Sequence, residues 1–298
     1  MSISALVSEY LYTVDNRITR SWYDQKLRIF AEWCQAHDVE MGSIRSVHIK
    51  QFAEYLRTRS HPRTGNPLSD QTVKGYVQVV QGFLSYAAKE EMNKRIEISL
   101  PKVENTPIEV FSKEQLNRLF AAIQKEGFPS LRVRDTAILS TLVDTGIRAS
   151  ELLTLTLDRL HLNENEPYID VIGKGRRRRE VGLSGQARRN IHRYVTRFRT
   201  GKKDYSQVFI SRRGQPMTPY GLDQMLYRLR DWAGITGVRV SAHTFRHTFA
   251  VHYLLSGGDI YLLSRILGHT NVSTTEIYLR AVKMQQVRKV QFSLLEEL

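Results

Sequence analysis

The chain has 298 residues, of which 41% are hydrophobic and 25% charged, as in globular proteins of one large domain or two ordinary ones. No stretch approaches about 18 apolar residues, so no membrane span is expected. The single cysteine, Cys34, excludes an intrachain disulfide and a cysteine metal cluster, and it favours an intracellular location.

The net charge of +14 is unevenly distributed along the chain. Residues 1–100 carry 13 Lys and Arg against 11 Asp and Glu, whereas residues 101–298 carry 31 against 19. A basic region of this kind attracts polyanions, of which nucleic acid is the commonest. The alternative is a basic surface that only keeps the protein in solution.

Residues 1–100 predict an all-helical domain. Apolar residues recur at helical spacing in residues 21–34 and 47–56, and again after Ser69, which suits an N-cap. Residues 61–68 (HPRTGNPL) form a polar loop between these helices. No strand pattern interrupts the segment.

Residues 101–110 (PKVENTPIEV) hold two prolines and no periodicity, which predicts a linker. Such a linker would serve as a hinge between two domains that clamp a partner. The alternative is a simple surface crossing between packed domains.

Residues 111–298 predict a second, mainly helical domain. Residues 135–145 form an apolar helix, and residues 167–172 and 180–183 read as two strands joined through a Gly-Lys-Gly-Arg turn. Helical patterns return after Gly185 and continue to about residue 280. The predicted class is therefore mainly α with one small antiparallel sheet.

The segment TGIRASEL at 145–152 contains the first candidate site residues. Gly146 ends the apolar helix, Arg148 begins the next one, and Glu151 lies on the same helix face as Arg148. An arginine held in this way suits bidentate contact with a phosphate. The alternative is an exposed ion pair that contributes little.

The predicted turn places Lys174 between two glycines. A lysine there could donate a proton to an oxygen that leaves phosphorus, or it could simply contact a nucleic-acid backbone. The four arginines that follow are predicted to make nonspecific, salt-dependent phosphate contacts: Arg176, Arg177, Arg178 and Arg179.

The segment HTFRH places His243, Arg246 and His247 on one helix face. A zinc site is the competing interpretation, because two histidines four residues apart have a ligand-like spacing. The helix offers no cysteine or nearby carboxylate, and the intervening arginine would repel a metal ion. No metal is therefore expected.

The last candidates lie near the C-terminus. Gly268 suits the end of the apolar helix 260–267, so His269 is expected in the following turn. Residues 273–276 (STTE) read as a capping box that begins a helix carrying Tyr278 near its second turn. The alternative for Tyr278 is a tyrosine that only packs beside Ile277 and Leu279.

Together these segments resemble the motifs of the tyrosine recombinases, or phage integrase family, in their order and spacing. The resemblance is carried by TGIRASEL, GKG, HTFRH, LGH and YL, and it extends over essentially the whole chain, including a helical core-binding domain at 1–100 and a catalytic domain at 111–298. Only the run of four arginines after Gly175 departs from the usual mixed turn.

The resemblance implies a role for each residue. Arg148, Arg246, His243 and His269 would bind and activate the scissile phosphate, and Lys174 would be the general acid for the 5′-oxygen. Tyr278 would be the nucleophile that forms a 3′-phosphotyrosyl bond, with Glu151 and His247 in support. The bond energy is then stored in the protein link, so no cofactor is expected.

The resemblance also implies double-stranded DNA as partner and a homotetramer on two DNA sites, with the apolar tail 279–298 exchanged between protomers. A cytoplasmic, nucleoid-associated location follows. Two alternatives stay open: a type IB topoisomerase that relaxes DNA, and a catalytically silent DNA-binding regulator. A simple Xer-type recombinase and a mobile-element integrase both fit the sequence.

Overall fold

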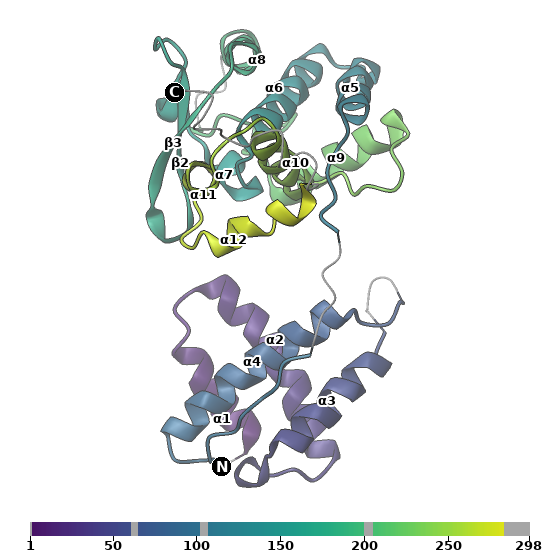
Figure 1. Cartoon of the computed structure of the whole chain (residues 1–298), viewed down its shortest axis with the longest axis vertical. Helices are drawn as coiled ribbons and strands as arrows, with labels where there is room; N and C mark the ends of the chain where they lie inside the picture. The colour runs from purple at the N-terminus through teal and green to yellow at the C-terminus, as the bar shows by residue number, and fades with distance from the viewer. Residues whose placement is uncertain (1, 61–64, 102–106, 200–204, 283–298) are drawn as a thin grey trace, which may run out of the picture. The chain divides into compact units, whose positions relative to one another are not determined.

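The structure is a computed structural model that describes residues 2–60, 65–101, 107–199 and 205–282, without the side chains of Lys174 and Arg280. Contacts divide the chain into two compact units, Met1–Thr106 and Pro107–Leu298 (Figure 1). The predicted fold class is confirmed, because the elements are mainly helices with one antiparallel sheet. No described helix combines the length and apolarity that a membrane span needs.

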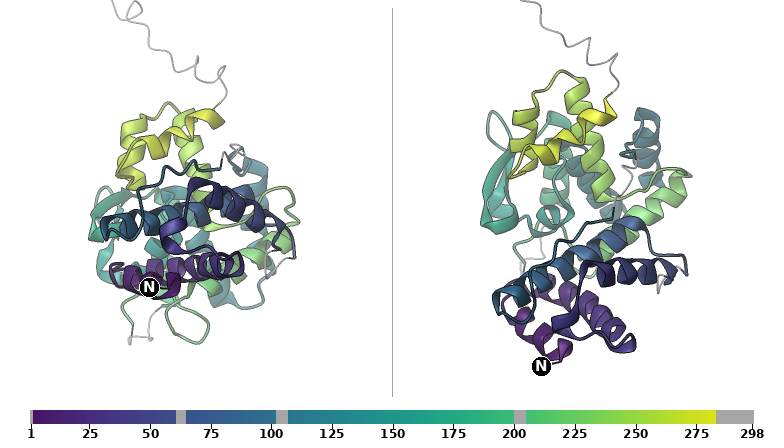
Figure 2. Two further views of the ribbon diagram at one scale, coloured as in Figure 1. Left: turned by 90° about the horizontal axis from the view of Figure 1, so that it is seen from below. Right: turned by 60° about the horizontal axis from the view of Figure 1, so that its bottom comes forward.

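The described part of the first unit is a bundle of helices, seen in two further views in Figure 2. The helices α1 and α4 both pack against α2, and α3 packs against α4. Phe30, Phe52 and Phe83 are fully buried between them. The Ser69 hydroxyl accepts a hydrogen bond from the Thr72 N–H and caps α4, as predicted. The helices are α1 (Ile3–Tyr12), α2 (Arg17–Ala36), α3 (Ser46–Thr58) and α4 (Asp70–Lys89).

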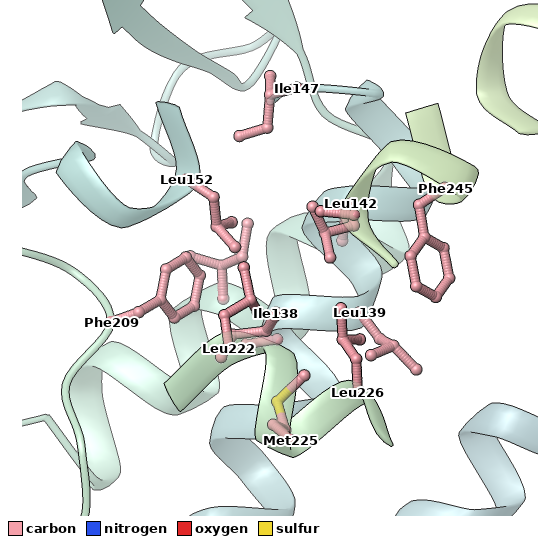
Figure 3. Packing of buried hydrophobic residues seen from close by; sticks show 14 of the residues in the cluster. Ile138, Leu139, Leu142, Ile147, Leu152, Phe209, Leu222, Met225, Leu226 and Phe245 are labelled. Atoms are coloured by element: carbon pink, nitrogen blue, oxygen red, sulfur yellow. The ribbon is translucent and has the colours of Figure 1, made fainter. Parts of the chain in front are cut away.

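The second unit is built around α6 (Pro129–Thr145), which packs against α8 and α10. Six consecutive residues of this helix, from Ala137 to Leu142, are buried, so it is covered on more than one side. Leu139 and Leu142 lie in the core beside Leu226 of α9 and Phe245 of α10 (Figure 3). The other helices are α5 (Lys113–Ala122), α7 (Ala149–Thr154), α8 (Gly185–Arg197), α9 (Pro219–Ala233), α10 (Ala242–Leu255), α11 (Ile260–Leu267) and α12 (Ser273–Glu276).

The sheet has the strand order β1-β2-β3, with β1 (Leu160–His161), β2 (Tyr168–Ile172) and β3 (Arg178–Gly182) all antiparallel. The hairpin of β2 and β3 was predicted, whereas β1 was not. β3 begins two residues earlier than predicted, with Ile172 opposite Arg178. Arg178 and Arg179 therefore lie in a strand, where successive side chains point to opposite faces.

The predicted linker 101–110 is only partly described. Residues 102–106 lie outside the described residues, but residues 107–110 belong to the second unit. The Glu109 carboxylate accepts a hydrogen bond from the Arg239 N–H, and Ile108 and Val110 pack against apolar residues of that unit. These residues are packed rather than free.

The segment before Tyr278 differs from the prediction. α12 is a single turn, and the predicted capping box is wrong because neither Ser273 nor any other residue caps it at the N-cap position. The side chain of Asn271 instead accepts a hydrogen bond from the Ser273 N–H at 3.0 Å. Tyr278 has helical backbone angles and lies between α12 and the short turn η5 (Leu279–Ala281). Most of the tail after Tyr278, residues 283–298, lies outside the described residues.

Candidate active site

The carboxylate of Glu151 is the centre of the ion pairs at the site. It is 3% exposed and accepts hydrogen bonds from the Arg148 N–H at 2.8 Å and from Arg148 Nη1 at 3.0 Å. Arg179 adds a bidentate pair, with Nη1 and Nη2 each 2.9 Å from a carboxylate oxygen. Burial raises the pKa of Glu151, but these hydrogen bonds and the charges of both arginines lower it by more than burial raises it. The pKa is therefore below its ordinary value.

Arg148 owes its position to the turn between α6 and α7. Gly146 ends α6 with φ of 59°, in the left-handed region that favours glycine, and Arg148 becomes the N-cap of α7. Its Nη1 also donates to the Leu267 carbonyl at 3.2 Å. The side chain keeps 36% of its surface exposed, so this guanidinium remains open to an anion from outside.

Arg246 reaches the same place from α10. It is 2% exposed, and it donates from Nη1 to the Gly146 carbonyl at 2.9 Å and from Nη2 to the Leu267 carbonyl at 2.7 Å. Burial and then the charge of Arg148 lower its pKa to about 10, which still leaves the side chain charged at neutral pH. Two cations therefore meet at the Leu267 carbonyl.

His269 completes this group from the turn after α11. Its Nε2 lies 2.8 Å from Arg246 Nη2, and its Nδ1 lies 2.8 Å from the Thr275 hydroxyl. Burial, followed by the charges of three arginines, lowers the pKa of His269 to about 4. The ring is therefore neutral at pH 7.

Tyr278 lies beside the histidines of α10. Its hydroxyl is 3.1 Å from His247 Nδ1, and the His247 ring stands edge-on to the His243 ring at 4.3 Å. The Tyr278 side chain is 2% exposed among apolar residues such as Val251 and Leu263. Burial raises the pKa of Tyr278, while the charges of Arg246 and Arg148 act to lower it. The phenol is therefore protonated in the free protein.

The two histidines of α10 differ in exposure. His243 is exposed and His247 is half-buried. Desolvation and then the charges of Arg246, Arg148 and Arg239 lower the pKa of His243. Burial, then the charges of His243 and Arg246, lower the pKa of His247 to about 4, so the ring is neutral near pH 7.

The arginines of the hairpin divide into two groups. Arg176 and Arg177 are exposed, and Arg178 is 65% exposed and paired with Asp170 at 3.0 Å. Arg179 is different: only 13% of its side chain is exposed, and Nε donates to the Ile266 carbonyl at 2.6 Å. The expectation of a nonspecific phosphate contact is therefore corrected for Arg179, because its donors are held inside the protein by Glu151 and Ile266.

The structure thus brings together most of the residues that the sequence selected. Arg148, Glu151, Arg246 and His269 form one hydrogen-bonded group, and His243, His247 and Tyr278 form a second group beside it. The backbone of Lys174 begins the short turn η4 (Lys174–Arg176) between β2 and β3, but its side chain lies outside the described part of the structure. Within the described ranges, no three His, Cys, Asp or Glu side chains are grouped to hold a metal ion.

Sequence reasoning missed one residue of the site, Thr275, and gave another, Arg179, a different role. Thr275, fully buried, contacts His269, and Arg179 holds Glu151. The signal for Arg179 was available, because Arg179 and the buried Val181 are two residues apart in a strand and so share a face. Nothing in the local sequence marks Thr275.

Comparisons with known proteins identify the family of the chain. The model of the phage integrase family matches residues 109–285, and that of the phage integrase SAM-like domain matches residues 3–99. Tyrosine recombinase XerC of Staphylococcus carnosus is 30% identical over 278 residues, which cover 91% of this chain and 88% of the relative. Tyrosine recombinase XerD of Oceanobacillus iheyensis is 27% identical over 274 residues, covering 89% and 88%.

Solved structures share the fold. XerH recombinase bound to its palindromic difH substrate, in a post-cleavage complex, matches with a TM-score of 0.74 at 23% identity, covering 94% of this chain and 80% of that one. The Tn1549 transposon integrase in complex with circular intermediate DNA matches with a TM-score of 0.75 at 18% identity, covering 97% and 98%. The family model covers more than half of the sequence and the XerC relative aligns over nine tenths of it, so the chain belongs to the phage integrase family and is a site-specific tyrosine recombinase.

Proposed function

We propose that this recombinase cleaves duplex DNA by attack of the Tyr278 hydroxyl oxygen on a backbone phosphorus. A new P–O bond forms to Tyr278 and the bond to the 5′-oxygen breaks, which gives a 3′-phosphotyrosyl link and a free 5′-hydroxyl. Attack by the 5′-hydroxyl of another strand reverses the chemistry and joins the strands. The phosphodiester energy is kept in the link, so no external energy source is needed.

The observation that supports this proposal is that two arginines and a histidine lie together close to Tyr278. Arg148 and Arg246 both donate to the Leu267 carbonyl, and Arg246 also contacts His269. Donors placed in this way can bind the non-bridging oxygens of a phosphate and stabilise the charge that grows on them during attack. In the free protein, backbone carbonyls occupy donors that DNA would use.

Proton transfers complete the mechanism. The neutral His247 ring, 3.1 Å from the phenol, is positioned to accept the Tyr278 proton as the oxygen attacks. His243, exposed on the same helix, contributes a further donor to the phosphate. Lys174, in the turn between β2 and β3, gives a proton to the 5′-oxygen as it leaves. Arg176, Arg177 and Arg178 contact the DNA backbone.

Replacing Tyr278 by phenylalanine tests the proposal. The DNA site is first selected from a randomised duplex library by binding, and a nick is then built beside the cleavage position so that the covalent product accumulates. Wild-type protein is expected to give a protein–DNA band on a denaturing gel, and Tyr278→Phe none, with unchanged affinity for the site. Tyr261→Phe, the same change at a 65% exposed position, is the matched control. Adducts formed by Tyr278→Phe would refute the assignment.

We infer that four copies act together on two DNA sites within the nucleoid. A two-site plasmid separates this reading from the alternatives. Exchange between the sites is expected, together with a complex of four chains and two duplexes in analytical ultracentrifugation. Relaxation of supercoils without exchange would indicate a topoisomerase, and binding without any adduct would indicate a silent regulator.

A further inference from the structure

Thr275 is a buried polar residue that the mechanism above does not use. It lies in α12, and its side chain is fully buried. Its hydroxyl oxygen lies 2.8 Å from Nδ1 of His269, six residues earlier in the chain. This contact holds the edge of the ring that faces away from Arg246, and so it fixes the direction in which Nε2 points.

The contacts on the two ring nitrogens determine which of them carries the proton. Arg246 Nη2 lies 2.8 Å from Nε2, and a guanidinium can only donate hydrogen bonds. Nε2 is therefore the acceptor, and the neutral ring carries its proton on Nδ1, which donates to Thr275. Burial, and then the charges of Arg246, Arg148 and Arg179, disfavour a second proton on the ring, and only Glu151 acts in the opposite direction.

DNA binding would change the partner of Nε2. The phosphate oxygens would take the donors of Arg246, and Nε2 would then face an oxygen that also can only accept. In its present tautomer His269 could not bond to that oxygen. The other neutral tautomer, with the proton on Nε2, could donate to it.

We propose that Thr275 is a positioning residue that lets His269 exchange one neutral tautomer for the other when DNA binds. A hydroxyl can accept or donate, so it can pair with Nδ1 in both states. The ring gives its Nδ1 proton to water and takes one proton from water at Nε2, so its charge is unchanged. The Thr275 hydroxyl then turns about its Cβ–Oγ bond and donates to Nδ1. A backbone carbonyl in its place could only accept and would hold the first tautomer.

Long-range ¹H–¹⁵N NMR on protein labelled at histidine tests the exchange directly. The His269 signals are assigned by their loss in His269→Gln. The free protein is expected to show a protonated Nδ1. The Tyr278→Phe protein bound to its selected duplex, which cannot be cleaved, is expected to show a protonated Nε2. The inference is overturned if the proton stays on Nδ1 in the DNA complex.

Variants at position 275 test the consequence for cleavage. Thr275→Val keeps the shape of the side chain but removes the hydroxyl, and it should slow single-turnover cleavage of the nicked site by about ten- to a hundredfold, as expected for a lost buried hydrogen-bond partner. Affinity for DNA should not change. Thr275→Ser should recover most of the rate, and Thr274→Val, at the exposed neighbouring threonine, should match wild type.

The inference rests on the proposed function, and the experiments separate the two. If wild-type protein forms no Tyr278 adduct, the proposed function fails. If wild-type protein forms adducts and Thr275→Val cleaves at the same rate, only the role of Thr275 is refuted. Equal loss of rate in Thr275→Ser and Thr275→Val would also refute it, because serine retains the hydroxyl.

Discussion

Replacing Arg179 by alanine would separate a structural role from a DNA contact. The change removes two hydrogen bonds to Glu151 and one to the Ile266 carbonyl. Glu151 is 3% exposed, so its carboxylate would keep only the bonds from Arg148. The anchor between β3 and the end of α11 would be lost at the same time.

The expected cost in unfolding free energy follows from burial. Removing one partner of a buried ion pair costs about 3–5 kcal/mol. Arg148 continues to compensate Glu151, so we expect about 3 kcal/mol, at the lower end of that range. Arg178→Ala is the matched control on the same strand. Arg178 is 65% exposed, and exposed pairs contribute about 0–1 kcal/mol.

Urea unfolding and salt titration of DNA binding measure the two roles separately. An arginine that neutralises a DNA phosphate contributes about 0.9 to the slope of log K against log salt. Arg177→Ala, at an exposed position of the turn, should lose about that much slope and little stability. Arg179→Ala should lose stability and keep the slope. A reduced slope with unchanged stability in Arg179→Ala would refute the conclusion that Arg179 has a structural role and does not contact DNA.

Two further predictions concern stability. Gly268→Ala should destabilise the protein more than Gly237→Ala in urea unfolding. Both positions have positive φ, but a Cβ at Gly268 would lie 2.8 Å from Arg179 Nη1, whereas nothing lies within 4 Å of a Cβ at Gly237. Equal losses of unfolding free energy would argue against close packing of Arg179. The unfolding free energy should also fall as pH is lowered from about 6.5 to about 4. The pKa values of His247 and His269 are lowered from 6.5 to about 4 in the folded protein, so the unfolded chain binds more protons in that window. His247→Gln should weaken this pH dependence, and a stability that rises on acidification would contradict it.

Much of the local structure could be predicted because it depends on residues close in the chain. Val73, Val77 and Leu84 recur on one face of α4, and Ser69 caps that helix. The glycines at 146 and 268 end α6 and α11 in left-handed conformations, as expected. The GKG turn joined two strands as predicted.

The sequence-based predictions were wrong where two local patterns in the same segment favoured different structures. The run of four arginines was read by its charge, although the period of two in β3 turns Arg179 inward and Arg178 outward. The STTE segment was interpreted as a capping box, although no side chain caps α12 and the Ser273 N–H donates to Asn271 instead. In β3 the outcome depends on which face of the strand the neighbouring elements cover, whereas at STTE a second local hydrogen bond replaces the expected one.

The candidate site could be selected from the sequence, because motif order and spacing identified Arg148, Glu151, Arg246, His269 and Tyr278 as residues of one kind of chemistry. Their roles, and that of Lys174, stay predictions until the adduct assay is done. Of the contacts among them, the pairing of Arg148 with Glu151, three residues apart, could be predicted, whereas those between distant segments could not. A hydrogen bond acts over about 3 Å, and helix periodicity fixes only neighbours three or four residues apart.

The sequence by itself therefore determined the class of fold, the ends of several helices and the set of candidate site residues. Only the tertiary structure decided that Arg246 bonds to the Gly146 carbonyl, 100 residues away, and that Arg179 bonds to Glu151 across 28 residues. It also decided that Thr275 faces His269. These contacts depend on how α6, β3, α10 and α11 pack, and that packing is set by the shared core rather than by any local segment.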